Sequence, residues 1–547
     1  MSASHKKDSF LYLLFLLFCI AAPGIYFRLF NDHWTTLVLN VSSIFALFLL
    51  PVYFFKRHLR KYTWVLLPVF LLGTINIACI YFYKMPITDG IIIVAINTNK
   101  EEFMELAGGF ILPFSLMAIF YLSLYFFCRK RVPEQIDNKT AARISMAALL
   151  TIVLLPFFDK TEYEYARKLR ARFYTTFPTS FLYSVGVVYK QYQVMYAAAD
   201  EREKFTFNAK QSIHPKEEQI YMLVVGESDR RDHWNRFGYH RNTTPKINQQ
   251  QNLIAFNNIH TSGYLTEFAV PILLTGVEPG NFMDHIKQKS IISAFKEAGF
   301  KTYWVSNQTD FGHISIHAAE ADEQFHFLAD RNKQIKNIND DIELLYPIKE
   351  ILSRKEAKKL IIVKLQGSHY DYSKRYPASF DKFKPSNKTI KTAANDFTKK
   401  DIIINTYDNT VLYADFVLDS MIKILNSRNT LSALLYVSDH GEDLFDDERN
   451  LSQHAAPIPS QYIAPIPMFI WYSPHLKKLS AENIDWLVRN AEKKGTSANV
   501  FYTLSQLSGI QFPGFDSTRS FASGTYKEQP RLILGGDFKV FNSDSLQ

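Results

Sequence analysis

Acidic and imidazole side chains follow two apolar runs of this sequence, at the point where each run stops. The run 433–438 is followed by Asp439 and His440 within SDHGEDL, and the run 220–225 ends just before Glu227. A solvated turn would explain Asp439 and His440, and a charge at a helix N-terminus would explain Glu227. The alternative is a metal site, which we favour because further polar residues occur in equivalent places.

Two histidines extend this pattern. The run 359–367 ends beside His369, and His454 follows downstream in LSQHAAPIP. Carboxylate oxygens and imidazole nitrogens, with no thiolates, suit Zn²⁺ in an open catalytic site, although these ligand types do not exclude Mn²⁺. Such an ion would polarise a phosphoryl oxygen and lower the pKa of a bound hydroxyl, which is the chemistry that phosphoryl transfer needs.

A covalent route would also need a nucleophile near the ion. The segment 260–276 (HTSGYLTEFAVPILLTG) offers Ser262 and Thr266 before an apolar stretch. Composition by itself does not choose between these hydroxyls, and Thr266 could simply cap a helix.

The elements that would position these residues are short apolar strands separated by helix-length segments. Buried continuous runs that alternate with helices are typical of a mainly parallel sheet covered by helices on both faces. In such sheets, ligands bind beyond the carboxyl ends of the strands. We therefore expect Glu, Asp and His residues to gather at one edge of a sheet formed by the runs 220–225, 302–307, 359–367, 433–438 and 466–473.

The first part of the chain has a different pattern. A bilayer span takes about 20 apolar residues, and five runs approach or reach that length. The first is not a cleaved signal peptide, because it has no small-residue cleavage site and a second span follows it directly. The predicted spans are 10–30, 34–55, 63–83, 108–128 and 141–157.

Lysine and arginine residues set the predicted orientation. Lys6 and Lys7, the loop 56–61 and the loop 129–143 all lie on one side if there are five spans, and basic loops stay in the cytoplasm. The N-terminus is then cytoplasmic and the soluble domain lies outside, in the periplasm of a bacterium. The net charge of +9 therefore reflects membrane topology, and we expect no nucleic-acid partner.

These features divide the 547 residues into three parts. Residues 1–157 form the predicted transmembrane domain, 158–215 an interfacial helical linker, and 216–547 a catalytic domain. All three cysteines, Cys19, Cys79 and Cys128, lie in the first part. The exported domain therefore has no disulfide framework and no thiolate metal ligand.

The blocks described so far resemble those of the bacterial phosphoethanolamine transferases, a membrane family of lipid A modification and polymyxin resistance. The resemblance spans essentially the whole chain and includes NTYDNTVLYAD at 405–415. It implies a five-helix membrane domain joined to a periplasmic α/β/α domain like those of alkaline phosphatase and the sulfatases. It also implies metal ligands at Glu227, Asp439, His440 and Thr266, the phosphoenzyme threonine at Thr266, and substrate-site histidines at His369 and His454.

The sequence also departs from the family pattern. The nucleophile block has no cysteine, and a lysine that helps to hold the donor head group in relatives is replaced by Gly312. The loop 84–107 resembles the donor-binding loop through Thr98 and Glu102, but an expected asparagine is Val94.

The resemblance implies a ping-pong reaction that uses Zn²⁺. Thr266 would take phosphoethanolamine from phosphatidylethanolamine and pass it to lipopolysaccharide or another envelope glycan. We expect a monomer in the inner membrane. The acceptor, the number of zinc ions and any role in polymyxin resistance stay open.

Three alternatives remain. A glycerol-phosphate transferase of the lipoteichoic acid synthase type would share the anchor and the metal–threonine chemistry. A sulfatase would need a Cys or Ser in a Cys/Ser-x-Pro-x-Arg setting, whereas Thr266 is followed by Glu-Phe-Ala. An inactive lipid-binding relative would not need the complete ligand set.

Overall fold

The computed structural model describes residues 3–31, 34–83, 86–97, 104, 110–158, 165, 168, 176–213, 215–310, 312–326, 340–454, 458–536 and 538–546. Backbone contacts divide the chain into two compact units. One comprises Met1–Thr98 with Ala107–Tyr192, and the other Asn99–Leu106 with Gln193–Gln547. We describe each unit by itself.

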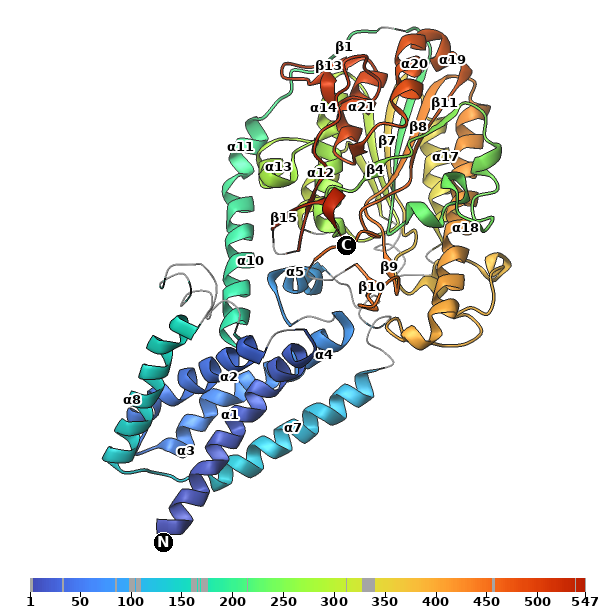
Figure 1. Cartoon of the computed structure of the whole chain (residues 1–547). Coiled ribbons are helices and arrows are strands. Elements are labelled where there is room, and N and C mark those ends of the chain that lie inside the picture. Colours follow the sequence, from blue (N-terminus) through green and yellow to red (C-terminus); the bar gives the residue numbers. More distant parts are fainter. Residues whose placement is uncertain are drawn as a thin grey trace. The chain divides into compact units, whose positions relative to one another are not determined.

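The first unit is helical (Figure 1). In the described part of the chain, 5 helical segments are long and apolar enough to cross a membrane: Ser9–Phe27, Thr36–Tyr53, Leu59–Tyr81, Ile111–Arg131 and Asn138–Phe158. They confirm the five predicted spans. The helices of this unit, the last of which runs on into the second, are α1 (Ala3–Asn31), α2 (Trp34–Leu49), α3 (Leu59–Tyr62), α4 (Leu66–Tyr83), α5 (Asp89–Asn97), α7 (Ile111–Arg131), α8 (Asn138–Leu154) and α10 (Thr179–Ala197).

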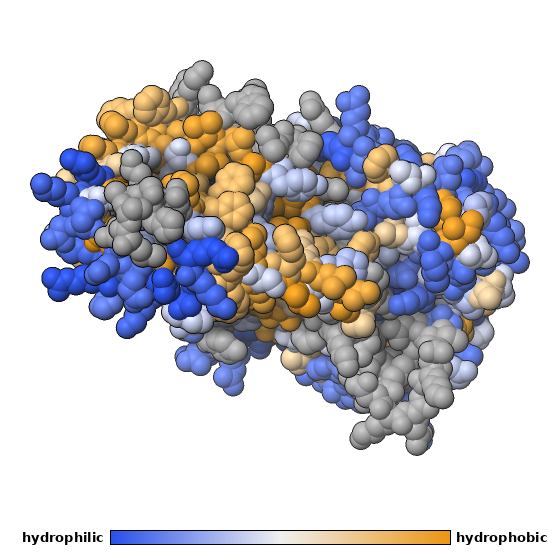
Figure 2. Space-filling model, turned by 90° about the horizontal axis from the view of Figure 1, so that it is seen from below, coloured by the Kyte–Doolittle hydropathy of each residue, from blue (hydrophilic) through white to orange (hydrophobic). Residues whose placement is uncertain are grey.

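The outer surface of these helices is apolar. On α7, Leu112, Leu116, Ile119 and Phe120 are each between 58% and 68% exposed, and Figure 2 shows such side chains gathered over the helical unit. Exposing these apolar side chains to water is unfavourable, whereas contact with lipid tails is not. The last turn of α7 is basic (Arg129–Arg131), as expected where a helix leaves the bilayer.

The second unit is built on a seven-stranded sheet with the strand order β3–β11–β8–β2–β7–β5–β6. Neighbouring strands from β8 to β6 are parallel, and β11 is antiparallel to both β8 and β3. The five predicted strands are all present, while the short, partly exposed edge strands β3 and β6 escaped prediction. The sheet comprises β2 (Gln219–Gly226), β3 (Leu253–Ala255), β5 (Lys301–Ser306), β6 (Glu323–His326), β7 (Lys358–Lys364), β8 (Leu431–Ser438) and β11 (Met468–Tyr472).

Helices cover both faces of this sheet (Figure 1). Alternate residues of β2 point to opposite faces, so every residue of the strand is buried. Tyr221, Leu223 and Val225 pack in the core with α12 (Thr266–Thr275), α14 (Ile291–Glu297), α20 (Ala481–Asn490) and α21 (Asn499–Leu507). Ile220, Met222 and Val224 pack in the core with α17 (Leu345–Ser353) and α18 (Lys400–Ser427).

Shorter elements complete the unit. The remaining helices are α11 (Ala199–Lys204), α13 (Asp284–Lys287), α15 (Gly312–Ala318) and α19 (Pro474–Leu479). The remaining strands form four pairs: β1 (Lys210–Gln211) with β13 (Ile510–Gln511), β4 (Ile259–His260) with β12 (Gly495–Thr496), β9 (Asp443–Leu444) with β10 (Ser452–Gln453), and β14 (Leu532–Leu534) with β15 (Val540–Asn542).

Candidate metal centre

The register of the two central strands brings the candidate ligands together. β2 and β8 are parallel neighbours, and Gly226 is opposite Ser438. The next residues, Glu227 and Asp439, therefore leave the sheet side by side at its carboxyl edge. Both side chains are buried, as expected for residues that follow strands covered on both faces.

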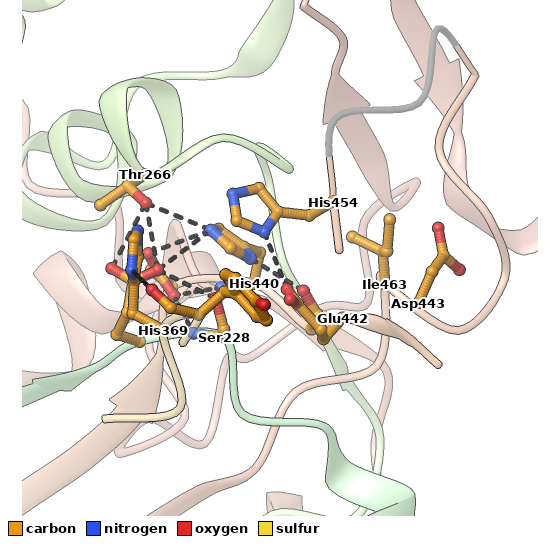
Figure 3. A network of polar contacts seen from close by, with 12 residues as sticks. Ser228, Thr266, His369, His440, Glu442, Asp443, His454 and Ile463 are labelled. Carbon is orange, nitrogen blue, oxygen red and sulfur yellow. Dashed lines mark hydrogen bonds and ion pairs between the residues drawn. The ribbon is translucent and has the colours of Figure 1, made fainter. Parts of the chain in front are cut away.

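Three predicted ligands and the predicted nucleophile meet at this edge, and Figure 3 shows Thr266 beside His440 there. Glu227, Asp439 and His440 each offer a ligand atom, and these atoms lie within 4.8 Å of one another. Thr266, the first residue of α12, places its Oγ1 3.2 Å from Nε2 of His440 and 3.3 Å from Oε2 of Glu227. This arrangement is a compact set of two carboxylates, one imidazole and one hydroxyl.

Neighbouring groups hold the three ligands in place. The backbone amides of Ser228 and His440 donate to Oδ1 of Asp439 at 3.0 and 2.7 Å. Oδ2 of Asp439 is buried and has no hydrogen-bond partner among the described residues. Nδ1 of His440 donates to the carbonyl oxygen of Gly441 at 2.8 Å, which turns Nε2 towards Thr266 and the two carboxylates.

Sequence reasoning missed a residue that holds Glu227. Nε2 of Gln308 donates to Oε2 of Glu227 at 2.9 Å and to the carbonyl oxygen of Leu365. Gln308 belongs to the segment SNQTDFG after β5. Its position after a strand of the same sheet was the available signal.

The electrostatics of the centre favour a cation. Burial raises the pKa of Asp439, and the nearby charge of Glu227 raises it further. Burial also acts to raise the pKa of Glu227, but the charges of His440, His369 and Lys364 outweigh it and lower that pKa. Two buried carboxylates this close repel each other, and a divalent ion would relieve that repulsion.

His454 lies beside His440 and forms a hydrogen bond with a further carboxylate, that of Glu442. Its ring centroid lies 4.0 Å from that of His440, and its Nδ1 lies 2.8 Å from Oε2 of Glu442. Tyr372 donates its hydroxyl proton to the other oxygen of Glu442 at 2.6 Å. Burial lowers the pKa of His454, and the charge of His440 acts in the same direction. The sequence SDHGEDL contains Glu442, but its role as the partner of His454 depends on the fold.

A second set of possible ligands follows from this contact. His440, Glu442 and His454 also offer ligand atoms within 4.8 Å of one another. In this structure both carboxylate oxygens of Glu442 form hydrogen bonds, one with Tyr372 and one with His454.

His369 is half-buried after β7, and its Nδ1 lies 2.7 Å from the carbonyl oxygen of Tyr370. Its charge acts on Glu227, and Figure 3 draws it beside the cluster. The turn before it requires glycine, because Gly367 has a φ of +50° and a Cβ there would lie 2.8 Å from the carbonyl oxygen of Glu227.

The predicted donor-binding residues Thr98 and Glu102 lie outside the described residues, so they stay predictions. Val94 lies within α5. Gly312 begins α15 and lies close to Glu267, the residue after the candidate nucleophile. Burial raises the pKa of Glu267 to about 8.

Residues 219–510 match the Sulfatase family. That match covers more than half of the chain. The chain belongs to the sulfatase family. Within it, the sequence is 28% identical over 520 residues to phosphoethanolamine transferase EptC from Escherichia coli K12, covering 90% of this chain and 88% of that relative.

Two solved structures are similar to this member of the family. The C-terminal periplasmic domain of E. coli EptC, in complex with Zn, has 30% identity and a TM-score of 0.56, covering 62% of this chain and 96% of that domain. The integral membrane protein lipooligosaccharide phosphoethanolamine transferase A from Neisseria meningitidis has 22% identity and a TM-score of 0.69, covering 95% and 98%.

These similarities confirm the predicted family, fold class and enzyme class. The chain is a transferase with a sulfatase-like domain attached to a five-helix membrane domain, and it groups with the phosphoethanolamine transferases.

Proposed function

We propose that this chain transfers phosphoethanolamine from phosphatidylethanolamine to lipopolysaccharide or another envelope glycan, through a covalent intermediate on Thr266. The observation that carries the proposal is the position of the Thr266 hydroxyl, within 3.4 Å of both Glu227 and His440 at the carboxyl edge of the sheet. The relatives named above are phosphoethanolamine transferases, and one of them acts on lipooligosaccharide by name.

The residues present fit a zinc ion. Oxygen and nitrogen donors in a buried cluster suit Zn²⁺. The buried Oδ2 of Asp439 accepts no hydrogen bond among the described residues and lies 3.4 Å from Nε2 of His440. Glu227, Asp439, His440 and the Thr266 hydroxyl would hold the ion, which would lower the pKa of that hydroxyl and polarise the phosphoryl group. Mn²⁺ stays an alternative by ligand type.

In the first half-reaction, Oγ1 of Thr266 forms a bond to the donor phosphorus while the bond from phosphorus to the diacylglycerol oxygen breaks. The hydroxyl proton of Thr266 passes to Nε2 of His454, which is free to accept it because Nδ1 donates to Glu442. His454 then gives this proton to the diacylglycerol oxygen. Phosphoethanolamine is then esterified to Thr266.

In the second half-reaction, an acceptor oxygen attacks the phosphorus and Oγ1 of Thr266 leaves. His454 would now take the acceptor proton and return it to Oγ1 of Thr266, and His369 would contact the phosphoryl oxygens. The orientation expected from the basic loops would put this reaction in the periplasm.

Replacing Thr266 with alanine tests the proposal. Without the hydroxyl no phosphoenzyme forms, so release of diacylglycerol from a fluorescent phosphatidylethanolamine should fall by roughly a thousandfold or more. Bound zinc should persist, because three ligands remain. Mass spectrometry of the digested wild type should find the phosphoethanolamine adduct on the peptide that contains Thr266.

Ser262→Ala is the matched control, since Ser262 is the other candidate nucleophile of the same segment and its buried Oγ has no hydrogen-bond partner among the described residues. This variant should transfer normally. Undiminished transfer by Thr266→Ala, or an adduct on Ser262, would refute the assignment. A fluorescent phosphatidylglycerol tested in parallel separates this activity from glycerol-phosphate transfer.

A further inference from the structure

Glu267 is a buried acid directly after the candidate nucleophile. It is the second residue of α12 and only 8% exposed. Its Oε1 accepts the backbone N–H of His313 at 2.5 Å. Among the described residues this is its one hydrogen bond, and no lysine, arginine or histidine forms an ion pair with it. A buried carboxyl without a cation is unfavourable.

The backbone makes room for this acid at Gly312. Gly312 has a φ of +48°, and a Cβ at that position would overlap Oε1 of Glu267. A side chain at 312 is therefore incompatible with the present position of Glu267. Where the family resemblance places a lysine, this chain combines a glycine with a carboxyl group. A buried carboxyl group thus lies beside the nucleophile, and a cation bound there would favour its ionised form.

The closest candidate counterion is already engaged elsewhere. Lys364 is buried at the end of β7, and its Nζ lies 3.5 Å from Oδ1 of Asp310. Its charge acts on Glu267 only from beyond ion-pair distance. Glu267 can therefore accept a cation from a bound ligand.

The proposed donor supplies such a cation. In phosphoethanolamine two methylene groups separate the phosphate ester oxygen from the ammonium group. While the phosphorus is bonded to Thr266, the ammonium must stay within a few ångströms of it, and consecutive Cα atoms are only about 3.8 Å apart. A carboxylate and an ammonium form a charge-assisted hydrogen bond.

We propose that Glu267 binds the ammonium group of the donor and so selects ethanolamine over uncharged head groups. This inference rests on the proposed function. The phosphoryl group would lie at Thr266 and the ammonium at Glu267, so that neighbouring residues of α12 bind the two charged ends of the head group.

The test compares a donor with a charged amine and one with a neutral amide: fluorescent phosphatidylethanolamine and its N-acetyl derivative. The full-length protein carries Glu267→Gln, which keeps the acceptor for the His313 amide but removes the charge. A charge-assisted hydrogen bond contributes about 1.5–3 kcal/mol, so kcat/KM for phosphatidylethanolamine should fall roughly tenfold to hundredfold, mainly through KM. Turnover of the N-acetyl donor should be unchanged.

Two further variants control for structure. Glu267→Asp keeps the charge and should restore most of the preference for the free amine. Glu297→Gln alters another carboxylate, which accepts the backbone amides of Phe207 and Ala209, and should leave the preference intact.

Equal losses with both donors in Glu267→Gln would show that Glu267 only ties α12 to α15, and would overturn the inference while leaving the proposed function standing. Absence of an adduct on Thr266 in the wild type with either donor would instead refute the proposed function, and this inference with it.

Discussion

Asp439 uses its two carboxylate oxygens differently. Oδ1 accepts two backbone amides, which fixes the turn after β8, and Oδ2 is buried and accepts no hydrogen bond among the described residues. The same residue thus shapes the loop and offers an oxygen to the centre. This division allows the two roles to be separated by substitution.

Asp439→Asn should retain the fold and lose zinc. The amide oxygen can still accept the N–H groups of Ser228 and His440, but the anionic ligand is gone, so zinc affinity should fall by at least roughly a hundredfold. Elemental analysis of the purified protein measures the bound zinc.

Asp443→Asn is the matched control, because Asp443 is also buried after β8 and its Oδ2 likewise has no hydrogen-bond partner among the described residues. Full zinc occupancy in Asp439→Asn would exclude Asp439 as a ligand.

At the scale of elements, α13 and α15 meet through a row of buried histidines. Nε2 of His285 lies 2.9 Å from Nδ1 of His313, and its Nδ1 lies 3.0 Å from Nε2 of His317. The row ends at Glu320, which also accepts from Arg202 of α11. Arg202 also donates to the backbone carbonyls of His285 in α13, Gln288 just after α13 and Ile316 in α15. This polar network therefore ties three helices together.

This row makes the stability of the catalytic unit dependent on pH. Burial lowers the pKa of His313 to about 3, with a smaller contribution from His317. The unfolded chain therefore binds more protons than the folded chain below about pH 6.5, and the stabilisation from this neutral side chain is present above that pH and lost as the pH falls.

We expect His313→Gln to lower the thermal midpoint of the catalytic unit at pH 7.5. The difference in free energy of unfolding between the variant and the wild type should become smaller as the pH falls towards 5. The difference should shrink by up to about 1.4 kcal/mol per pH unit. Buried carboxyl groups such as Asp415, whose pKa burial raises to about 7, titrate alike in both proteins and cancel in the comparison. The exposed His240 provides a control, because His240→Gln should give a constant difference. A constant difference for His313→Gln would contradict the prediction.

At the scale of the whole molecule, the five spans decide on which side the catalysis occurs. An odd number of spans carries the C-terminus to the side opposite the N-terminus, and the basic residues of loops 56–61 and 129–143 favour the cytoplasm. A phosphatase reporter fused after Gln547 should therefore be active, which requires the periplasm. The same reporter fused within 129–137 should be inactive. The reverse result would mean that the orientation is inverted.

The sequence by itself determined the features that depend on local composition. Apolar runs of membrane length predict the five spans, because a helix must match the thickness of the bilayer. Continuous apolar runs such as 220–225 predict strands buried on both faces, and the acids and histidines that follow them point to one edge of the sheet. Short edge strands such as β3 lacked that signal, because one side of each meets solvent.

Only the tertiary structure decided which of these residues meet. The neighbouring positions of β2 and β8 put Glu227 beside Asp439, and the packing of α12 brings the hydroxyl of Thr266 to 3.2 Å from His440 while that of Ser262 stays unpartnered among the described residues. The sequence left that choice of hydroxyl open without the family resemblance, and gave no sign that Glu267 would face Gly312. The physical reason is the separation along the chain of the residues that interact. Composition and periodicity report on neighbours along the chain, whereas strand order and the contacts between helices arise from packing residues that are far apart in sequence.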